Sequence, residues 1–234
     1  MHGKDYRKNL ITVPSCDKHN TQKSKDDEFL MACLAPVVGN NGTAFIHTNT
    51  KLARAQARNQ RLIDKTIRDA RKVNIVGPDG MTFPTLVGRP DMPRFCRALQ
   101  TVARGLYFHA NGKRFKGKVT VMPSFLNYPR GDMMSVVQLL SQRMFDQERD
   151  DWETHGENPQ IFSYQIGPVD QYGLIPMVMT FYSRAEVFTA FQPKGVHIPH
   201  KNVFDATPES PIDVDITIGE GENARHLTWR CTGE

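Results

Sequence analysis

The chain has 234 residues, of which 39% are hydrophobic and 24% are charged, and its formal net charge is +5. This composition supports a packed core and argues against wholesale disorder. No run reaches the roughly 18 apolar residues that a membrane-spanning helix needs, and the N-terminus lacks the apolar segment of a signal peptide. We therefore expect a cytoplasmic protein with no membrane partner, whose positive charge permits a nucleic-acid partner.

The sequence divides into three regions, which we take as residues 1–36, 37–90 and 91–234. In the first region, residues 9–14 are β-prone and apolar and predict a short strand. A tight polar segment follows at residues 15–20. Ser24 and Asp27 then resemble a capping box and predict a helix over residues 25–34.

The middle region is predicted to contain a long basic helix. Residues 38–50 are rich in Gly, Asn and Thr and favour a loop. Residues 51–73 then predict a helix, and residues 76–92 contain turn signals typical of a connector or a short hairpin. Six basic residues recur at steps of four and three, which places them on one helical face; they are Arg54, Arg58, Arg61, Lys65, Arg68 and Lys72.

The last region predicts an α+β fold, in which two helices cover a mostly antiparallel sheet. Helical periodicity marks residues 92–107, with Pro93 in the first turn, and residues 133–148. Strand patterns follow the first of these helices and then the second, with hairpins expected at residues 182–185 and between the last two strands. The predicted strands are residues 118–126, 160–166, 174–182, 186–191, 213–218 and 225–231.

The four cysteines are scattered, and only Cys16 has a suggestive neighbour, His19. A thiolate and an imidazole separated by two residues can bind one tetrahedral zinc ion from a single knuckle. Two ligands are half of such a site. The alternative interpretation is a small buried cysteine beside a surface histidine.

The segment NLITVPSCDKHNTQKSKDDEFL resembles the second half of HNH endonuclease domains from bacteria and phages. Those domains contain a strand, a Cys-x-x-Cys or Cys-x-x-His pair, an Asn, and a polar helix start with acidic residues. Two further segments, VARGLYFHANGKRF and MVMTFYSRAEVFTAF, resemble a helix and a strand that follow this unit in some relatives.

The resemblance implies a partial ββα-metal fold and a role for four residues. Asn9 would orient the catalytic base, and Cys16 and His19 would be the second pair of ligands of a structural zinc. Asn20 would hold the catalytic Mg²⁺ or a similar ion. From the residues alone, Asn9 is equally a turn residue and Asn20 a helix cap.

The first half of the HNH motif does not precede Asn9 in this sequence. The Asp/Glu-His-x-x-Pro segment that carries the general base and the first cysteine pair are both missing, and His2 has no acidic or proline neighbour of the expected kind. Three explanations stand: a misassigned or truncated start, another polypeptide that supplies the missing half, or a degenerate remnant kept for binding or structure. In a homo-oligomer, a second copy could contribute the other zinc ligands. We expect an HNH endonuclease-like nucleic-acid-binding protein that is truncated or catalytically incomplete.

Two alternatives accompany this expectation. The chain could be a non-enzymatic binding protein, phage- or defence-related, with a purely structural knuckle. The basic helix could be an ordinary solvated face instead of a surface about 30 Å long that follows the phosphates of a nucleic acid. We favour the phosphate-binding interpretation, with DNA favoured over RNA, because the chain is basic and because of the HNH resemblance.

Overall fold

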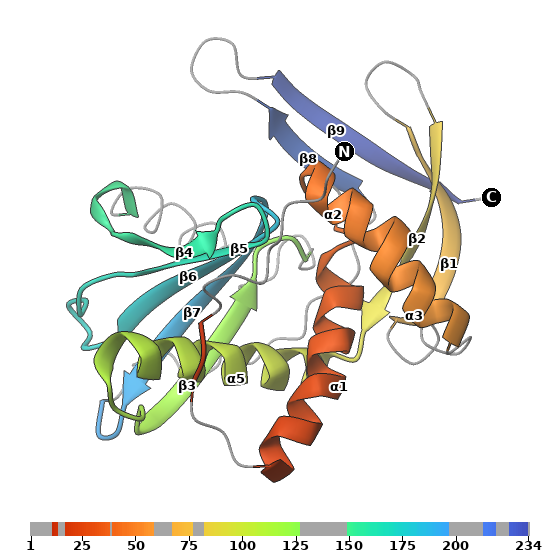
Figure 1. Ribbon diagram of the computed structural model, residues 1–234. Helices are drawn as coiled ribbons and strands as arrows, with labels where there is room; N and C mark the ends of the chain where they lie inside the picture. Colours follow the sequence, from red (N-terminus) through yellow and green to blue (C-terminus); the bar gives the residue numbers. More distant parts are fainter. Residues whose placement is uncertain are drawn as a thin grey trace.

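The computed structural model describes residues 11–13, 17–37, 39–58, 67–76, 82–126, 149–196, 213–218 and 225–233. These residues form helices and two antiparallel sheets, so the predicted α+β class is confirmed (Figure 1). The predicted helix at residues 133–148 lies outside the described residues.

The larger sheet has five strands in the order β3-β7-β6-β5-β4, and all neighbours are antiparallel. Four of these strands were predicted with small shifts at their ends, and β4 was not predicted. The strands are β3 (Gly117–Pro123), β4 (Thr154–Asn158), β5 (Phe162–Ile166), β6 (Ile175–Phe181) and β7 (Ala185–Pro193).

The two central strands of this sheet are buried on both faces. Met177 and Met179 of β6 are fully buried and belong to the main hydrophobic core. Val178 lies between them in sequence, so it points to the opposite face, where it pairs with Phe188 of β7. Both residues of that pair are buried as well. Residues packed on both sides therefore fix the register of the sheet.

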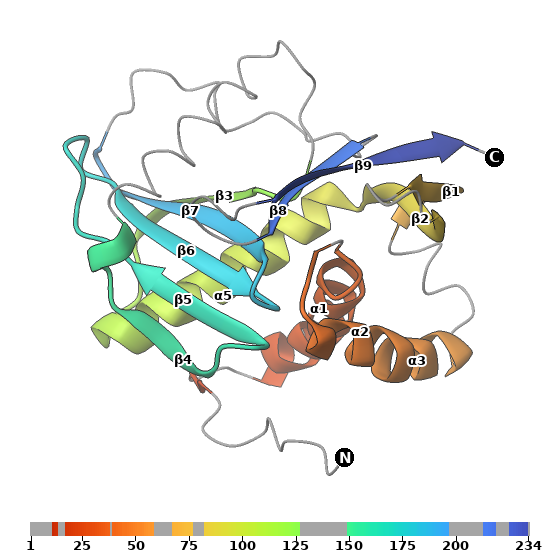
Figure 2. The ribbon, with the colours of Figure 1, turned by 90° about the horizontal axis from the view of Figure 1, so that it is seen from above.

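Helix α5 (Met92–Asn111) covers one face of this sheet (Figure 2). Its start is fixed by Asp91, whose carboxylate accepts a hydrogen bond from the Arg94 backbone N–H at 3.3 Å. Phe95 and Leu99 are fully buried on its inner face. The helix ends at Gly112, whose φ of 66° is a conformation that glycine adopts without strain. The helix predicted over residues 92–107 is thus confirmed and extends by one turn.

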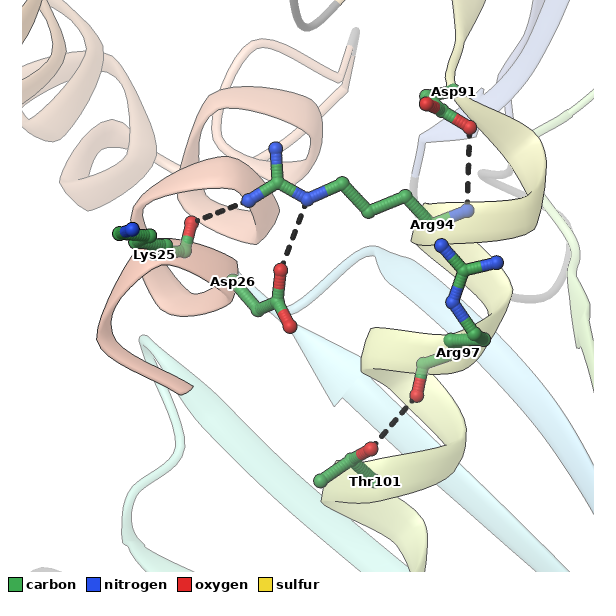
Figure 3. Close-up of polar contacts among 6 residues, drawn as sticks. All are labelled: Lys25, Asp26, Asp91, Arg94, Arg97 and Thr101. Carbon is green, nitrogen blue, oxygen red and sulfur yellow. Dashed lines mark hydrogen bonds and ion pairs between the residues drawn. The ribbon is translucent and has the colours of Figure 1, made fainter. Parts of the chain in front are cut away.

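Helix α1 (Asp17–Leu34) packs against α5 through an aromatic pair, and Arg94 of α5 makes polar contacts to α1 (Figure 3). The rings of Phe29 and Phe95 lie 6.4 Å apart, edge to face. Arg94 lies over the Phe29 ring at 4.3 Å and donates to the Asp26 carboxylate at 2.9 Å. A second guanidinium nitrogen donates to the backbone carbonyl of Lys25 at 2.9 Å.

The second sheet corrects the prediction of a long basic helix. It contains four strands in the order β2-β1-β9-β8, and β1 covers residues that the charge pattern assigned to the helix. The C-terminal hairpin was predicted. The connector or short hairpin expected at residues 76–92 is part of a longer antiparallel pair, which β1 forms with β2. The strands are β1 (Ile67–Val76), β2 (Thr82–Pro90), β8 (Asp213–Ile218) and β9 (Arg225–Gly233).

Residues of β1 form a strand instead of a helix because they pair with strands that the local sequence does not reveal. Strand β1 lies between β2 and β9, so it has hydrogen-bonding neighbours on both sides. Pairing with two neighbours outweighs the modest helical preference of its Arg, Lys and Ala residues.

We predict that Phe95→Ala lowers the free energy of unfolding by about 3–5 kcal/mol, because it leaves a cavity between α1, α5 and the sheet. Asp26→Ala removes only a partly exposed ion pair and should cost about 1 kcal/mol or less. Urea denaturation measures both values. A loss from Phe95→Ala no larger than that from Asp26→Ala would contradict the packing described above.

Candidate nucleic-acid interface

The N-terminal segment that resembles an HNH knuckle is largely helical. Helix α1 begins at Asp17 instead of the predicted Lys25, and it contains His19 and Asn20 in its first turn. The knuckle expected at residues 15–20 is therefore wrong from Asp17 onward. The Lys and Gln residues in this stretch are good helix formers, so the helix continues N-terminally beyond the cap expected at Ser24.

Other parts of the predicted knuckle differ or lie outside the structure. Residues 11–13 form no strand, although a strand was expected there. Asn9 and Cys16 lie outside the described residues. The position of Asn20 on a helix is the one that the HNH resemblance requires of a metal-holding residue.

The described residues do not complete a metal site around this segment. Within them, no group of three or more His, Cys, Asp or Glu residues is placed to hold an ion. We derive no hydrolytic step from the described residues.

The first part of the predicted basic helix belongs to a continuous helical segment, residues 42–58, which we call the α2–α3 segment. It comprises α2 (Gly42–His47), a π-helical turn η1 (Thr48–Leu52) and α3 (Ala53–Arg58). The loop predicted over residues 38–50 is wrong from Gly42 onward. The helix starts there because Asn41 caps it, accepting a hydrogen bond from Ala44 N–H at 3.1 Å.

The π-helical turn decides which side chains of this segment face the protein. The buried positions are Ala44, His47, Leu52 and Ala55. Regular α-helical spacing from His47 would place Lys51 on the inner face. The wider turn shifts the register so that Leu52 is buried and Lys51 is exposed.

The six basic residues predicted to share one helical face therefore do not lie on a single helix. Arg54 and Arg58 are exposed on α3. Arg68 and Lys72 lie on strand β1, so they do not continue the helical face. Arg61 and Lys65 lie outside the described residues.

The α2–α3 segment is held by the turn between β6 and β7. The His47 Nδ1 and the Tyr182 hydroxyl are 3.1 Å apart, and the two rings meet edge to face. Asn41 donates from its side chain to the Gln160 carbonyl at 2.7 Å and to the Ser183 hydroxyl at 2.9 Å. Tyr182 and Ser183 have φ values of 51° and 62°, which are typical of a two-residue hairpin turn. The hairpin predicted at residues 182–185 is thus confirmed.

A second basic surface, which the sequence patterns did not single out, lies where α5, β3 and β7 meet (Figure 1). We call it the basic turn surface and define it as Lys113, Arg114, Lys116 and Lys194, all exposed. The Lys194 backbone N–H donates to the Lys116 carbonyl at 3.3 Å, which brings the two turns together.

The basic turn surface rests on a rigid base. The ring of Phe115 contacts those of Tyr107 and Phe191 at centroid distances of 5.1 and 5.0 Å. Arg104 donates to the carbonyls of Phe115 and Gly117 at 3.3 and 2.8 Å, fastening the turn to α5. The cations around Phe115 are therefore displayed from a fixed backbone.

One sequence signal could have revealed this surface. No Asp or Glu occurs between Asp91 and Asp132, whereas the same stretch contains eight basic residues. They are Arg94, Arg97, Arg104, Lys113, Arg114, Lys116, Lys118 and Arg130. The contribution of Lys194 depends on strand pairing and is not visible in the sequence.

No protein-family model, curated protein or solved structure matches this chain. Interpretation of its function therefore rests on the chemistry of its own residues. In the part of the chain that the structure describes, none of the helices has the length and apolar character needed to cross a membrane.

His197 and His200, two imidazoles that could bind a metal ion, lie outside the described residues, as do the acidic residues Asp146 and Glu148. Asp150 and Asp151 lie in the short 3₁₀ turn η2 (Arg149–Asp151). The aromatic residues Tyr182, Phe188 and Phe191 are buried.

We predict that protonation of His47 weakens the attachment of the α2–α3 segment. Burial, and then the positive charge of Lys51, lower the pKa of His47 below its ordinary value of 6.5. Near pH 6.5 and below, His47 therefore binds protons more readily in the unfolded chain than in the folded chain. The free energy of unfolding consequently declines as the pH falls below about 6.5, and this effect is absent at higher pH.

Urea denaturation between pH 5 and pH 7.5 measures this decline. His47→Gln keeps a hydrogen-bonding side chain without a titratable group, so its stability should vary less over the same range. If the free energy of unfolding depended equally on pH in the two proteins, His47 would not be the cause of the decline.

Proposed function

We propose that this chain is an HNH nuclease-like protein that binds nucleic acid through the phosphate backbone. The observation that supports nucleic-acid binding is the basic turn surface, where strand pairing brings Lys194 beside the turn that contains Lys113, Arg114 and Lys116. No acidic residue occurs in the stretch that supplies the three cations of this turn. The exposed cations of the α2–α3 segment add a second positive surface.

The chemistry of these groups suits phosphate better than bases. Lysine ammonium and arginine guanidinium groups neutralise phosphates and release condensed counterions, which gives affinity without sequence preference. The fixed backbone beneath Phe115 reduces the ordering cost of binding. We accordingly propose that contacts to the backbone dominate, with DNA as the favoured partner.

The HNH part of the proposal concerns the segment around His19. Asn20 would hold a divalent ion and Asn9 would orient a base only if another polypeptide, or sequence preceding this chain, supplies the general base. Cys16 and His19 would then form half of a structural zinc site. Such an ion would supply Lewis-acid stabilisation of the phosphate under attack.

The alternative is a non-enzymatic binding protein in which the N-terminal segment is purely structural. The helical conformation of residues 17–34 favours it, because a continuous helix replaces the expected knuckle from Asp17 onward. In this alternative the chain catalyses no hydrolysis and acts by binding or interaction alone.

We predict that the double variant Arg114→Glu, Lys194→Glu weakens binding to a 20-base-pair duplex roughly tenfold or more at 100 mM salt, because it reverses two phosphate contacts. Fluorescence anisotropy with the full chain measures the dissociation constant. The control is Lys25→Glu, Arg184→Glu, which makes the same change in net charge at two exposed residues distant from the surface. Equal losses in both variants would mean that net charge alone governs binding.

We predict that the purified protein contains about one zinc ion per chain. The double variant Cys16→Ser, His19→Ala should contain none. Elemental mass spectrometry of both proteins measures the metal. Zinc lost in the variant supports the HNH proposal and directs cleavage assays with added Mg²⁺. Wild-type protein free of zinc after purification without chelators would favour the structural alternative.

A further inference from the structure

The α2–α3 segment combines exposed apolar residues with exposed cations. Phe45 is 71% exposed and Ile46 is 59% exposed, and they are neighbours on α2. Isolated exposed hydrophobic residues are ordinary, but adjacent ones on an anchored helix beside cations are characteristic of a binding surface. Lys51, Arg54 and Arg58 follow them along the same segment, all exposed.

Hydrogen bonds along the helix place a cation in the same row as Ile46, next to the row that begins with Phe45. Arg54 Nε donates to the Thr50 carbonyl at 3.1 Å, so its side chain is directed toward the start of the segment. Thr50 in turn donates from its hydroxyl to the Ile46 carbonyl at 2.6 Å. Ile46, Thr50 and Arg54 therefore lie in one row on the exposed side of the helix.

The charge of this surface is not offset by its own stretch of sequence. No Asp or Glu occurs between Glu28 and Asp64. The opposite face of the segment is fixed by Ala44, His47, Leu52 and Ala55, which are buried. The exposed ring and the cations are thus presented together on a helix whose orientation is set by its contacts with the protein.

We propose that the α2–α3 segment binds single-stranded nucleic acid, with an unpaired base stacked on Phe45 and phosphates held by Arg54 and Arg58. This inference rests on the proposed function and assigns a strand preference to one of its surfaces. Base stacking on aromatic side chains beside cations is the usual means of binding single strands. In a duplex the faces of the bases are covered by neighbouring base pairs, so the Phe45 ring cannot stack on them.

The small apolar area of this segment favours a nucleic acid over a lipid surface. The apolar part consists of Phe45 and Ile46, whereas a helix that inserts into a membrane buries a whole apolar face. Here the apolar residues Leu52 and Ala55 are turned inward. Both views place this segment at the opposite side of the molecule from the basic turn surface (Figures 1 and 2), so the two surfaces can be varied separately.

The test compares binding of the full chain to a 20-nucleotide oligothymidine and to a 20-base-pair duplex by fluorescence anisotropy. Phe45→Ala should weaken oligothymidine binding at least about fivefold and change duplex binding less than about twofold. Phe45→Tyr, which keeps the ring, should restore oligothymidine binding. The matched control is Tyr172→Ala, which removes another exposed aromatic ring, 54% exposed, and should leave both affinities unchanged.

The outcomes separate this inference from the proposed function. Unchanged oligothymidine binding in Phe45→Ala, with duplex binding that still depends on Arg114 and Lys194, would overturn the single-strand assignment alone. Binding of neither nucleic acid by the wild-type chain would overturn the proposed function as well. Loss of binding to vesicles containing anionic lipid in Phe45→Ala, without any effect on oligothymidine, would assign the surface to a membrane and also overturn the inference.

Discussion

The packing of α5 against the five-stranded sheet is the constraint on which the rest of the structure depends. Phe95 and Leu99 are fully buried between the sheet and α1. Because this apolar face is covered along its length, the helix continues to Asn111 and ends at Gly112. The next residues form a turn at the margin of the core, and this is where Lys113 and Arg114 are exposed. The position of the basic turn surface is therefore a consequence of core packing.

The same principle places the second positive surface. Tyr182, at the turn between β6 and β7, contacts His47 and holds the α2–α3 segment. The π-helical turn then buries Leu52 and leaves Lys51 in solvent. In both places buried aromatic residues fix the backbone, and cations project from it. A protein organised in this way presents charge to a polyanion with little loss of its own conformational entropy.

The sequence predicted the elements whose signals are local. Periodicity and Pro93 predicted α5, and alternation with turn residues predicted the strands that pair with their chain neighbours. The charge pattern of residues 51–73 was misleading, because β1 pairs with β9, about 150 residues away, and such partners leave no local signal. For the same reason Lys194 could not be assigned to a site with Lys116. The roles assigned to Asn9, Cys16, His19 and Asn20 stay predictions.

The salt dependence of duplex binding tests phosphate contact most directly. The dissociation constant of the wild-type chain for a 20-base-pair duplex would be measured between 50 and 200 mM salt. Contact through three or more phosphates predicts that the logarithm of the association constant falls linearly with the logarithm of salt concentration, with a slope of about −3 or steeper. Absence of binding at 50 mM salt, or a slope near zero, would contradict binding through the phosphate backbone.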